Sequence, residues 1–132
     1  MLAFSLPRPG GSADVSARAM SILDEPGRTF ASSEFVRLEV LPKALFNKKP
    51  HEADFYMEYF RSISHWPSVS EAVVKNAYDI AVRFGLSAMD SLHVAAALAV
   101  GADEFITTER RGKPLHRVTD IRVLSIHPDA SS

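Results

Sequence analysis

The chain has 132 residues, of which 46% are hydrophobic and 23% charged, and these values are typical of one soluble globular domain. Its 15 basic and 16 acidic residues give a net charge of −1, which excludes a generally basic nucleic-acid-binding surface but leaves room for a local basic patch. There is no cysteine, so disulfides and thiolate metal sites are excluded, which fits a reducing cytoplasm.

The N-terminal part of the chain has a short apolar stretch, Leu2 to Leu6, that ends at prolines and glycines. It is compatible with a strand, with the start of a helix or with a loose arm. A secretory signal is not expected, because Arg8, the basic residue nearby, follows the apolar stretch instead of preceding it. No apolar run reaches the ~18 residues that span a bilayer, so we expect no membrane segment and a cytoplasmic location. Asp14 is placed to cap a short helix that ends at Pro26.

A strand and a helix are predicted next. Thr29 to Ser33 is short and rich in residues that favour strands, and its last residue is placed to cap a helix. One face of that helix is expected to carry Phe35, Leu38 and Leu41. Pro42 is expected to kink or restart the helix, because proline lacks the backbone N–H that a helix interior needs.

Two more helices are predicted in the middle of the chain. The aromatic-rich stretch His51 to Ile63 predicts a helix that packs on a neighbour, and a partner or substrate surface is the alternative. Ser70 is placed to cap the following helix, and Gly85 is suited to the left-handed conformation that often ends one. The apolar positions of that helix are Val73, Val74, Ala77, Ile80 and Ala81.

The segment Ser87 to Val100 has the clearest helix pattern. Its first residue is followed by Asp90 in a pattern that resembles a capping box, with Asp in place of the usual Glu or Gln. Gly101 is placed to end the helix. Its expected apolar face consists of Met89, Leu92, Ala96 and Ala99.

Strands and helices alternate, with short apolar strands predicted at Phe105 to Thr108 and Ile121 to Ile126, and this favours an α/β sandwich with a parallel sheet. In such sheets, sites form at the carboxyl ends of the strands. Three acids lie in or near such places: Glu109 directly after a strand, Asp90 in the first turn of a helix, and Glu39 two turns into another helix. Each has a plainer interpretation, Asp90 as a helix cap and the two glutamates as solvated residues.

Acids that converge from separate elements can support one kind of chemistry in particular. Hydrolysis of a phosphodiester needs stabilised charge on the phosphoryl oxygens and an activated water, and Mg²⁺ or Mn²⁺ held by a few carboxylates supplies both. Converging carboxylates repel one another and are costly unless a cation neutralises them. Composition and spacing do not show whether the three acids converge.

Three stretches resemble the signature of PIN domains. Gly85-Leu86-Ser87-Ala88-Met89-Asp90-Ser91-Leu92-His93 resembles the pattern Leu-Ser-Ala-x-Asp-Ala-Leu-His, which opens an Ala-rich helix. Phe105-Ile106-Thr107-Thr108-Glu109 resembles the strand of that family that ends in Thr-x-Asp, with the longer Glu in place of Asp. Ser33 to Val40 resembles the helix that carries the second acid, and the likeness runs from about Ala19 to Ile126.

The resemblance implies a fold and a domain organisation. We expect a three-layer α/β/α sandwich with a central parallel sheet, formed by one PIN-like domain over residues 1–132. Residues 1–13 are expected to be irregular or truncated, and residues 127–132 to be a loose tail.

The resemblance also implies an activity, because PIN domains are metal-dependent ribonucleases, many of them VapC toxins paired with an antitoxin. Glu39, Asp90 and Glu109 are then expected to be catalytic and to bind Mg²⁺ or Mn²⁺. Thr107 or Thr108 would support the strand-end site by hydrogen bonding. The residues expected to meet RNA phosphates are Arg110, Arg111 and Lys113, whose plainer interpretation is a solvated loop.

Two further expectations concern a histidine and the partners. His93 follows Asp90 by one helical turn and is interpreted as a core or supporting residue, with metal ligation as the alternative. An RNA substrate, an antitoxin protein and a homodimer are implied by the resemblance alone. The aromatic face between Phe55 and Phe60 is one candidate surface for the dimer.

The N-terminus departs from the PIN pattern. The first, central strand of the family usually carries an aspartate in a Leu-Asp-x-Asn/Ser pattern, and no such pattern precedes Ala19. Met1 to Phe4 instead resembles the apolar start of the helix that follows that strand. The comparison implies that the strand is missing with its aspartate, so weak or absent nuclease activity is expected. A non-catalytic RNA- or protein-binding module is the alternative, and a different metal-dependent phosphoesterase agrees less well with the signature.

Overall fold

The computed structural model describes residues 2–4, 30–61, 63, 66, 70–107 and 109–126. The helix predicted after Asp14, the C-terminal tail and Thr108 lie outside these residues. Within them, no helix is both long enough and apolar enough to cross a membrane.

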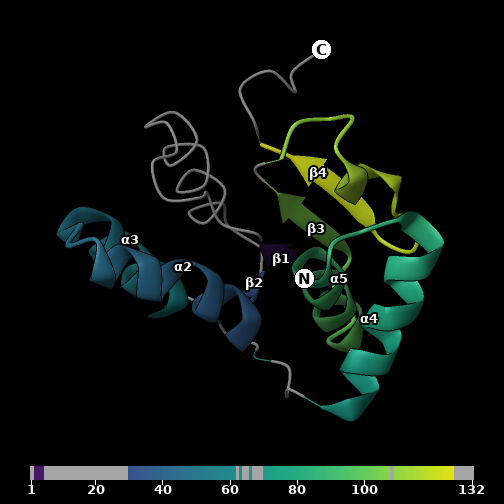
Figure 1. Cartoon of the computed structure of the whole chain (residues 1–132), viewed down its shortest axis with the longest axis horizontal. Helices are drawn as coiled ribbons and strands as arrows, with labels where there is room; N and C mark the ends of the chain where they lie inside the picture. The colour runs from purple at the N-terminus through teal and green to yellow at the C-terminus, as the bar shows by residue number, and fades with distance from the viewer. Residues whose placement is uncertain are drawn as a thin grey trace.

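Four short strands form one parallel sheet in the order β2-β1-β3-β4 (Figure 1). Their bounds are Leu2–Phe4 for β1, Phe30–Ala31 for β2, Glu104–Thr107 for β3 and Arg122–Ser125 for β4. Along the described part of the chain, helices lie between β2 and β3 and a 3₁₀ helix lies between β3 and β4. Because the strands are parallel, all four end at the same edge of the sheet.

The N-terminal residues correct one expectation. Leu2 to Phe4 form the central strand β1, whose first residue pairs with Phe30 on one side and Glu104 on the other. The prediction of a missing N-terminal strand, and of helical character at these residues, is therefore wrong. The strand consists of Leu, Ala and Phe, so it carries no acid. Three apolar residues have no periodicity of their own, and they become a strand only through partners far along the chain.

The described part of the chain contains four α-helices, and three of them start at the predicted serine caps. The hydroxyl oxygens of Ser33, Ser70 and Ser87 each accept a hydrogen bond from the backbone N–H three residues later. Gly85 ends one helix with a φ of 67°, a conformation that glycine adopts without strain. The helices are α2 (Glu34–Phe46), α3 (Pro50–Arg61), α4 (Glu71–Phe84) and α5 (Ala88–Ala99), and a short 3₁₀ helix, η1, spans Pro114–Arg117.

The two faces of the sheet belong to two separate apolar cores. Phe105 and its register partner Val123 pack in the core that contains α4 and α5. Ile106 and its partner Leu124 pack in the core that contains α2 and α3. Successive side chains of a strand point to opposite faces, so this division places one helix pair on each side (Figure 1). The expected three-layer α/β/α arrangement with a parallel central sheet is confirmed.

The helix faces were predicted less well than the helix ends. In α2 the buried residues are Val36, Val40 and Ala44, whereas Leu38 is 68% exposed. The helix runs through Pro42 without restarting. In α5 burial extends around most of the helix rather than along the predicted face, and it covers Ser91, His93, Val94, Ala95, Ala96 and Ala97.

The aromatic helix α3 packs against α2, which confirms the interpretation of His51 to Ile63 as a packing helix. Tyr56, Tyr59 and Phe60 are buried inside the chain. Burial raises the pKa of Tyr56 to about 12, with the nearby Glu52 carboxylate adding to the rise. Most of the aromatic face is therefore part of the chain's own core.

Candidate active site

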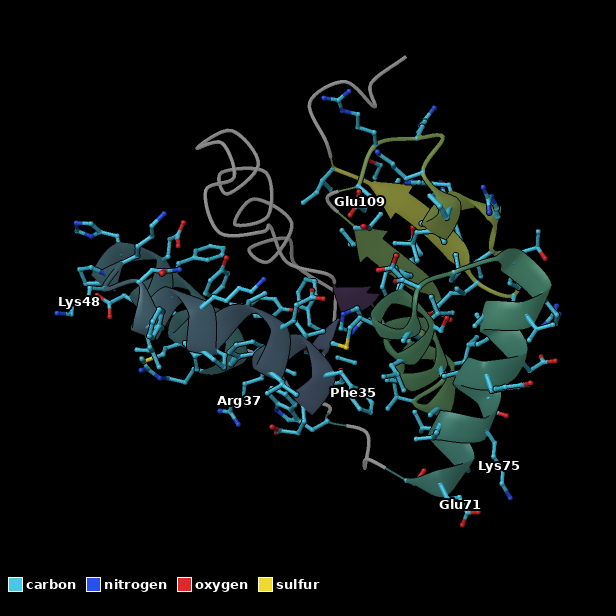
Figure 2. The ribbon with its side chains drawn as sticks, in the orientation of Figure 1. Phe35, Arg37, Lys48, Glu71, Lys75 and Glu109 are labelled. Atoms are coloured by element: carbon cyan, nitrogen blue, oxygen red, sulfur yellow. The ribbon has the colours of Figure 1, made fainter. Side chains whose placement is uncertain are left out.

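The three predicted acids come from three different elements on the same side of the domain. Glu39 lies in the second turn of α2, Asp90 in the first turn of α5, and Glu109 two residues after β3. Figure 2 shows Glu109 beside the ends of β3 and β4, above the start of the chain's Ala-rich helix. The carboxyl end of the sheet is where α/β proteins build their sites, because loops and helix starts meet there.

Electrostatics links the three acids. The pKa of Asp90 is raised above its ordinary value, first because the carboxyl is partly buried and then because the Glu109 and Glu39 carboxylates lie close enough to repel its negative charge. The His93 ring and a hydrogen bond with Ser87 act in the opposite direction. The Asp90 carboxyl is therefore affected by side chains on α2, on α5 and on the loop after β3.

Glu39 and His93 connect the two helices that border this site. His93 Nε2 lies 3.5 Å from Glu39 Oε1, and the His93 side chain is 2% exposed while that of Glu39 is 37% exposed. Neither ring nitrogen of His93 has a hydrogen-bond partner in the described part of the chain, so the 3.5 Å approach is a close polar contact rather than a formed hydrogen bond. His93 is thus a core residue whose polar edge faces a predicted site acid.

The backbone of Glu109 is fixed by three side chains. Its N–H donates to Thr107 Oγ1 at 3.1 Å. Its carbonyl accepts from Ser125 Oγ at 2.6 Å and lies 3.1 Å from His116 Nε2. A carbonyl oxygen can only accept, so this contact needs the proton on Nε2 of His116.

Sequence reasoning missed Ser125 and His116. Ser125 is the register partner of Thr107, so both polar side chains stand at the ends of neighbouring strands. The sequence does hold a signal for Ser125. One apolar strand ends in threonine and the next ends in serine, and this pattern indicates a polar edge of the sheet. His116 lies in η1, and no local pattern connects it with Glu109.

The basic residues predicted to meet phosphates lie on the loop that begins at Glu109. Arg110, Arg111 and Lys113 are exposed, and Gly112 between them has a φ of 93°, which a side chain would disfavour. The three basic residues therefore lie on an exposed loop that directly follows Glu109.

The donor chemistry of the three carboxylates fits Mg²⁺ or Mn²⁺, because hard divalent cations prefer oxygen ligands. The arrangement is not that of a finished ligand set, however. Within residues 2–4, 30–61, 63, 66, 70–107 and 109–126, no three His, Asp or Glu side chains are gathered closely enough to hold one ion. The acids repel one another without yet converging on a single point.

No family model matches the sequence, and no curated protein matches it either. Among solved structures, the chain is similar to VapBC2 from Rickettsia felis, crystallised with a DNA fragment from their promoter. The TM-score is 0.64 at 12% sequence identity, and the match covers 95% of this chain and 98% of the other. At this identity the likeness concerns the fold alone, and together with the parallel sheet between two helix pairs it shows that this chain has a PIN-like α/β fold.

Proposed function

We propose that this chain is a metal-dependent endoribonuclease domain of the VapC toxin type, with low activity because its central strand carries no acid. The observation that carries the proposal is the coupling of Asp90 to both Glu39 and Glu109, which raises the pKa of Asp90 after the larger effect of burial. Three acids from separate elements that disturb one another at a strand edge are unfavourable unless they serve a cation or a proton transfer.

In this proposal Glu39, Asp90 and Glu109 hold Mg²⁺ or Mn²⁺. The bound ion would neutralise charge on the phosphoryl group and make water a better nucleophile. Thr107 keeps the Glu109 backbone in place through its hydrogen bond. The phosphates of the RNA backbone would be met by Arg110, Arg111 and Lys113, which attract any sequence equally.

A second candidate function rests on a separate observation. β1 is the central strand, its three residues carry no acid, and the remaining acids are not gathered into a ligand set in the described part of the chain. A PIN-like domain in that condition would bind RNA or a protein partner without cutting. By likeness to VapBC2, whose name denotes a paired system, we propose an antitoxin as that partner and a homodimer as the assembly.

The decisive experiment is cleavage of a fluorescently labelled single-stranded RNA by the purified full-length chain with Mg²⁺, with Mn²⁺ and with EDTA. We expect slow cleavage that requires a divalent ion and falls by about 100-fold in Asp90→Asn and Glu39→Gln. Glu58→Gln is the matched control, because Glu58 is an exposed helix glutamate that pairs only with Arg61 among its described ion pairs.

The outcomes separate the two candidates. Cleavage that survives Asp90→Asn would come from a contaminant and would refute the nuclease proposal, as would no cleavage with either metal. If the chain does not cut but binds the RNA, and if replacing Arg110 and Lys113 by Gln weakens that binding and reduces its salt dependence, the binding module is the better description.

A further inference from the structure

His93 is a buried polar side chain without an evident structural reason. It lies in α5, its side chain is 2% exposed, and neither ring nitrogen has a hydrogen-bond partner in the described part of the chain. Buried polar groups in native proteins are nearly always hydrogen-bonded, so each exception needs an explanation. An apolar residue in place of His93 would fill the space without the cost of burying an unpaired polar group, and the neighbouring buried residue, Val94, is apolar.

The structure shows which carboxylate lies close to the His93 ring. Glu39 Oε1 lies 3.5 Å from His93 Nε2, and a small rotation of either side chain would bring the two atoms within hydrogen-bond distance. Glu39 belongs to α2 and His93 to α5, two helices in direct contact. The Glu39 side chain is 37% exposed, so part of it remains accessible while its Oε1 lies near the ring.

The same ring is placed next to the second acid. Asp90 precedes His93 by three residues on α5, and residues at this spacing are neighbours on one side of a helix. Fixing the rotamer of a ligand side chain is the usual task of a residue that supports a ligand. His93 is a polar group placed to favour the rotamer of Glu39 that faces Asp90.

We propose that His93 is a positioning residue, whose Nε2–H donates to the Glu39 carboxylate and holds it across the α2–α5 contact in the orientation that faces Asp90. The assignment deepens the proposed function and rests on it only for the use made of Glu39. It requires a proton on Nε2 of His93, because a carboxylate oxygen accepts and only a ring N–H can donate.

Two variants separate positioning from packing. His93→Gln keeps a donor at nearly the position of Nε2, whereas His93→Leu keeps the volume and removes the donor. We expect Mn²⁺ affinity, measured calorimetrically without RNA, to stay within about threefold of wild type in His93→Gln and to fall by at least about tenfold in His93→Leu. A purely structural role would lower the melting temperature of His93→Leu and leave the Mn²⁺ affinity of the folded protein unchanged, which would overturn the proposal.

A second measurement depends neither on metal nor on activity. Two-bond ¹H–¹⁵N spectra of the full chain at neutral pH report which ring nitrogen carries the proton. We expect the Nε2–H tautomer for His93 and a change in its Nε2 shift in Glu39→Gln but not in the control Glu58→Gln. An Nδ1–H tautomer, or a shift that ignores Glu39→Gln, would refute the contact. If the tautomer is as expected but no variant binds Mn²⁺, the positioning stands and the proposed metal-dependent function fails.

Discussion

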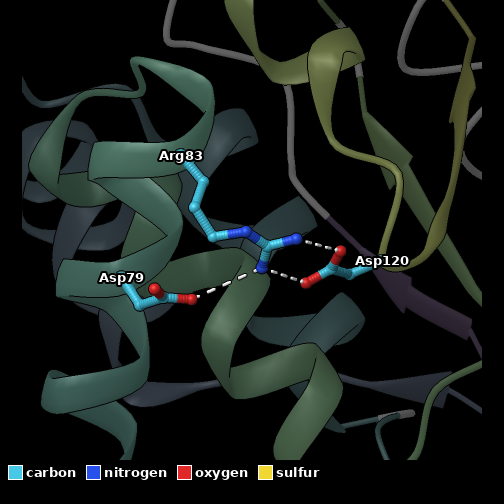
Figure 3. Close-up of polar contacts among 3 residues, drawn as sticks. All are labelled: Asp79, Arg83 and Asp120. Atoms are coloured by element: carbon cyan, nitrogen blue, oxygen red, sulfur yellow. Dashed lines mark hydrogen bonds and ion pairs between the residues drawn. The ribbon is translucent and has the colours of Figure 1, made fainter.

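Two charged clusters of this domain hold aspartates whose pKa values move in opposite directions. At the strand edge, burial and the Glu109 and Glu39 carboxylates raise the pKa of Asp90. In the last turn of α4, the Arg83 guanidinium donates to both oxygens of Asp120 at 2.7 and 2.8 Å and lowers the pKa of that carboxyl (Figure 3). One aspartate faces like charges, and the other faces a cation.

The difference separates scaffold from site. Arg83 also reaches Asp79 at 3.4 Å, so it joins one turn of α4 to the loop before β4, and the cluster is complete within the chain (Figure 3). The planar fork of an arginine suits this two-oxygen contact. At the strand edge, by contrast, the Glu109 and Glu39 carboxylates add to the rise in the pKa of Asp90 that burial causes. A carboxyl whose pKa is raised by burial and by like charges is the better place to look for a ligand.

The largest expected effect comes from adding a divalent cation. If the acids bind Mg²⁺, a concentration near 100 times its Kd should raise the free energy of unfolding of the wild-type chain by about 2.7 kcal/mol. Asp90→Asn should abolish this gain, whereas Asp120→Asn should retain it. Thermal unfolding in rising MgCl₂, with NaCl at matched ionic strength, measures the effect. Equal gains in all three proteins would mean that the ion acts elsewhere.

The next largest effect concerns the scaffold end of α4. Gly85→Ala should lower the free energy of unfolding by about 1 kcal/mol, because its φ of 67° is left-handed and a Cβ there would lie 3.0 Å from Arg117 Nη1. That nitrogen donates to the Phe84 carbonyl, so part of the helix end would have to move. Mn²⁺ affinity should stay unchanged. Chemical denaturation gives the first quantity and calorimetry the second, and a loss of affinity would show that the two regions are coupled.

A smaller effect tests the two aspartates directly. At neutral pH without divalent ions, Asp90→Asn should raise the melting temperature slightly, because it removes a carboxylate that burial and its neighbours disfavour. Asp120→Asn should lower it, because it breaks the pair with Arg83. Scanning calorimetry on the two variants and on wild type measures the melting temperatures. Shifts of the same sign in both variants would contradict the opposite roles of the two aspartates.

The elements whose cause is local could be predicted from the sequence. The caps at Ser33, Ser70 and Ser87 and the glycine at 85 each depend on hydrogen bonds or dihedrals within a few residues. β1 could not be predicted, because its three residues become a central strand only by pairing with β2 and β3. The prediction of the buried face of α2 failed for a similar reason. Apolar residues lie on two faces of this helix, and only the neighbouring elements decide which face is covered.

The candidate site divides in the same way. Asp90 could be identified because a serine cap and an Ala-rich helix surround it. Its contact with charges from α2 and from the loop after β3 depends on how helices pack on the sheet, which no local pattern encodes. The approach of His93 to Glu39 and the hydrogen bond from Ser125 to Glu109 join residues of separate elements, so both became visible only in three dimensions.

The smallest effect, and the one that distinguishes the two aspartates most sharply, is their pH dependence. The pKa of Asp90 is higher in the folded protein than in the unfolded chain, where it is about 3.9. Asp90 therefore does not lower the free energy of unfolding below about pH 3.9, and it lowers it increasingly as the pH rises from there toward the folded pKa. A lowered folded pKa means that the stabilisation from Asp120 is present above about pH 3.9 and is lost as pH falls through the folded value. The stability difference between wild type and Asp90→Asn should therefore change above about pH 3.9, and that for Asp120→Asn below it. Urea unfolding from about pH 3 to pH 7 measures both. In Glu39→Gln the upper end of the Asp90 window should move to lower pH, because one of the repelling carboxylates is gone, and an unmoved window would mean that Glu39 does not contribute to the raised pKa of Asp90.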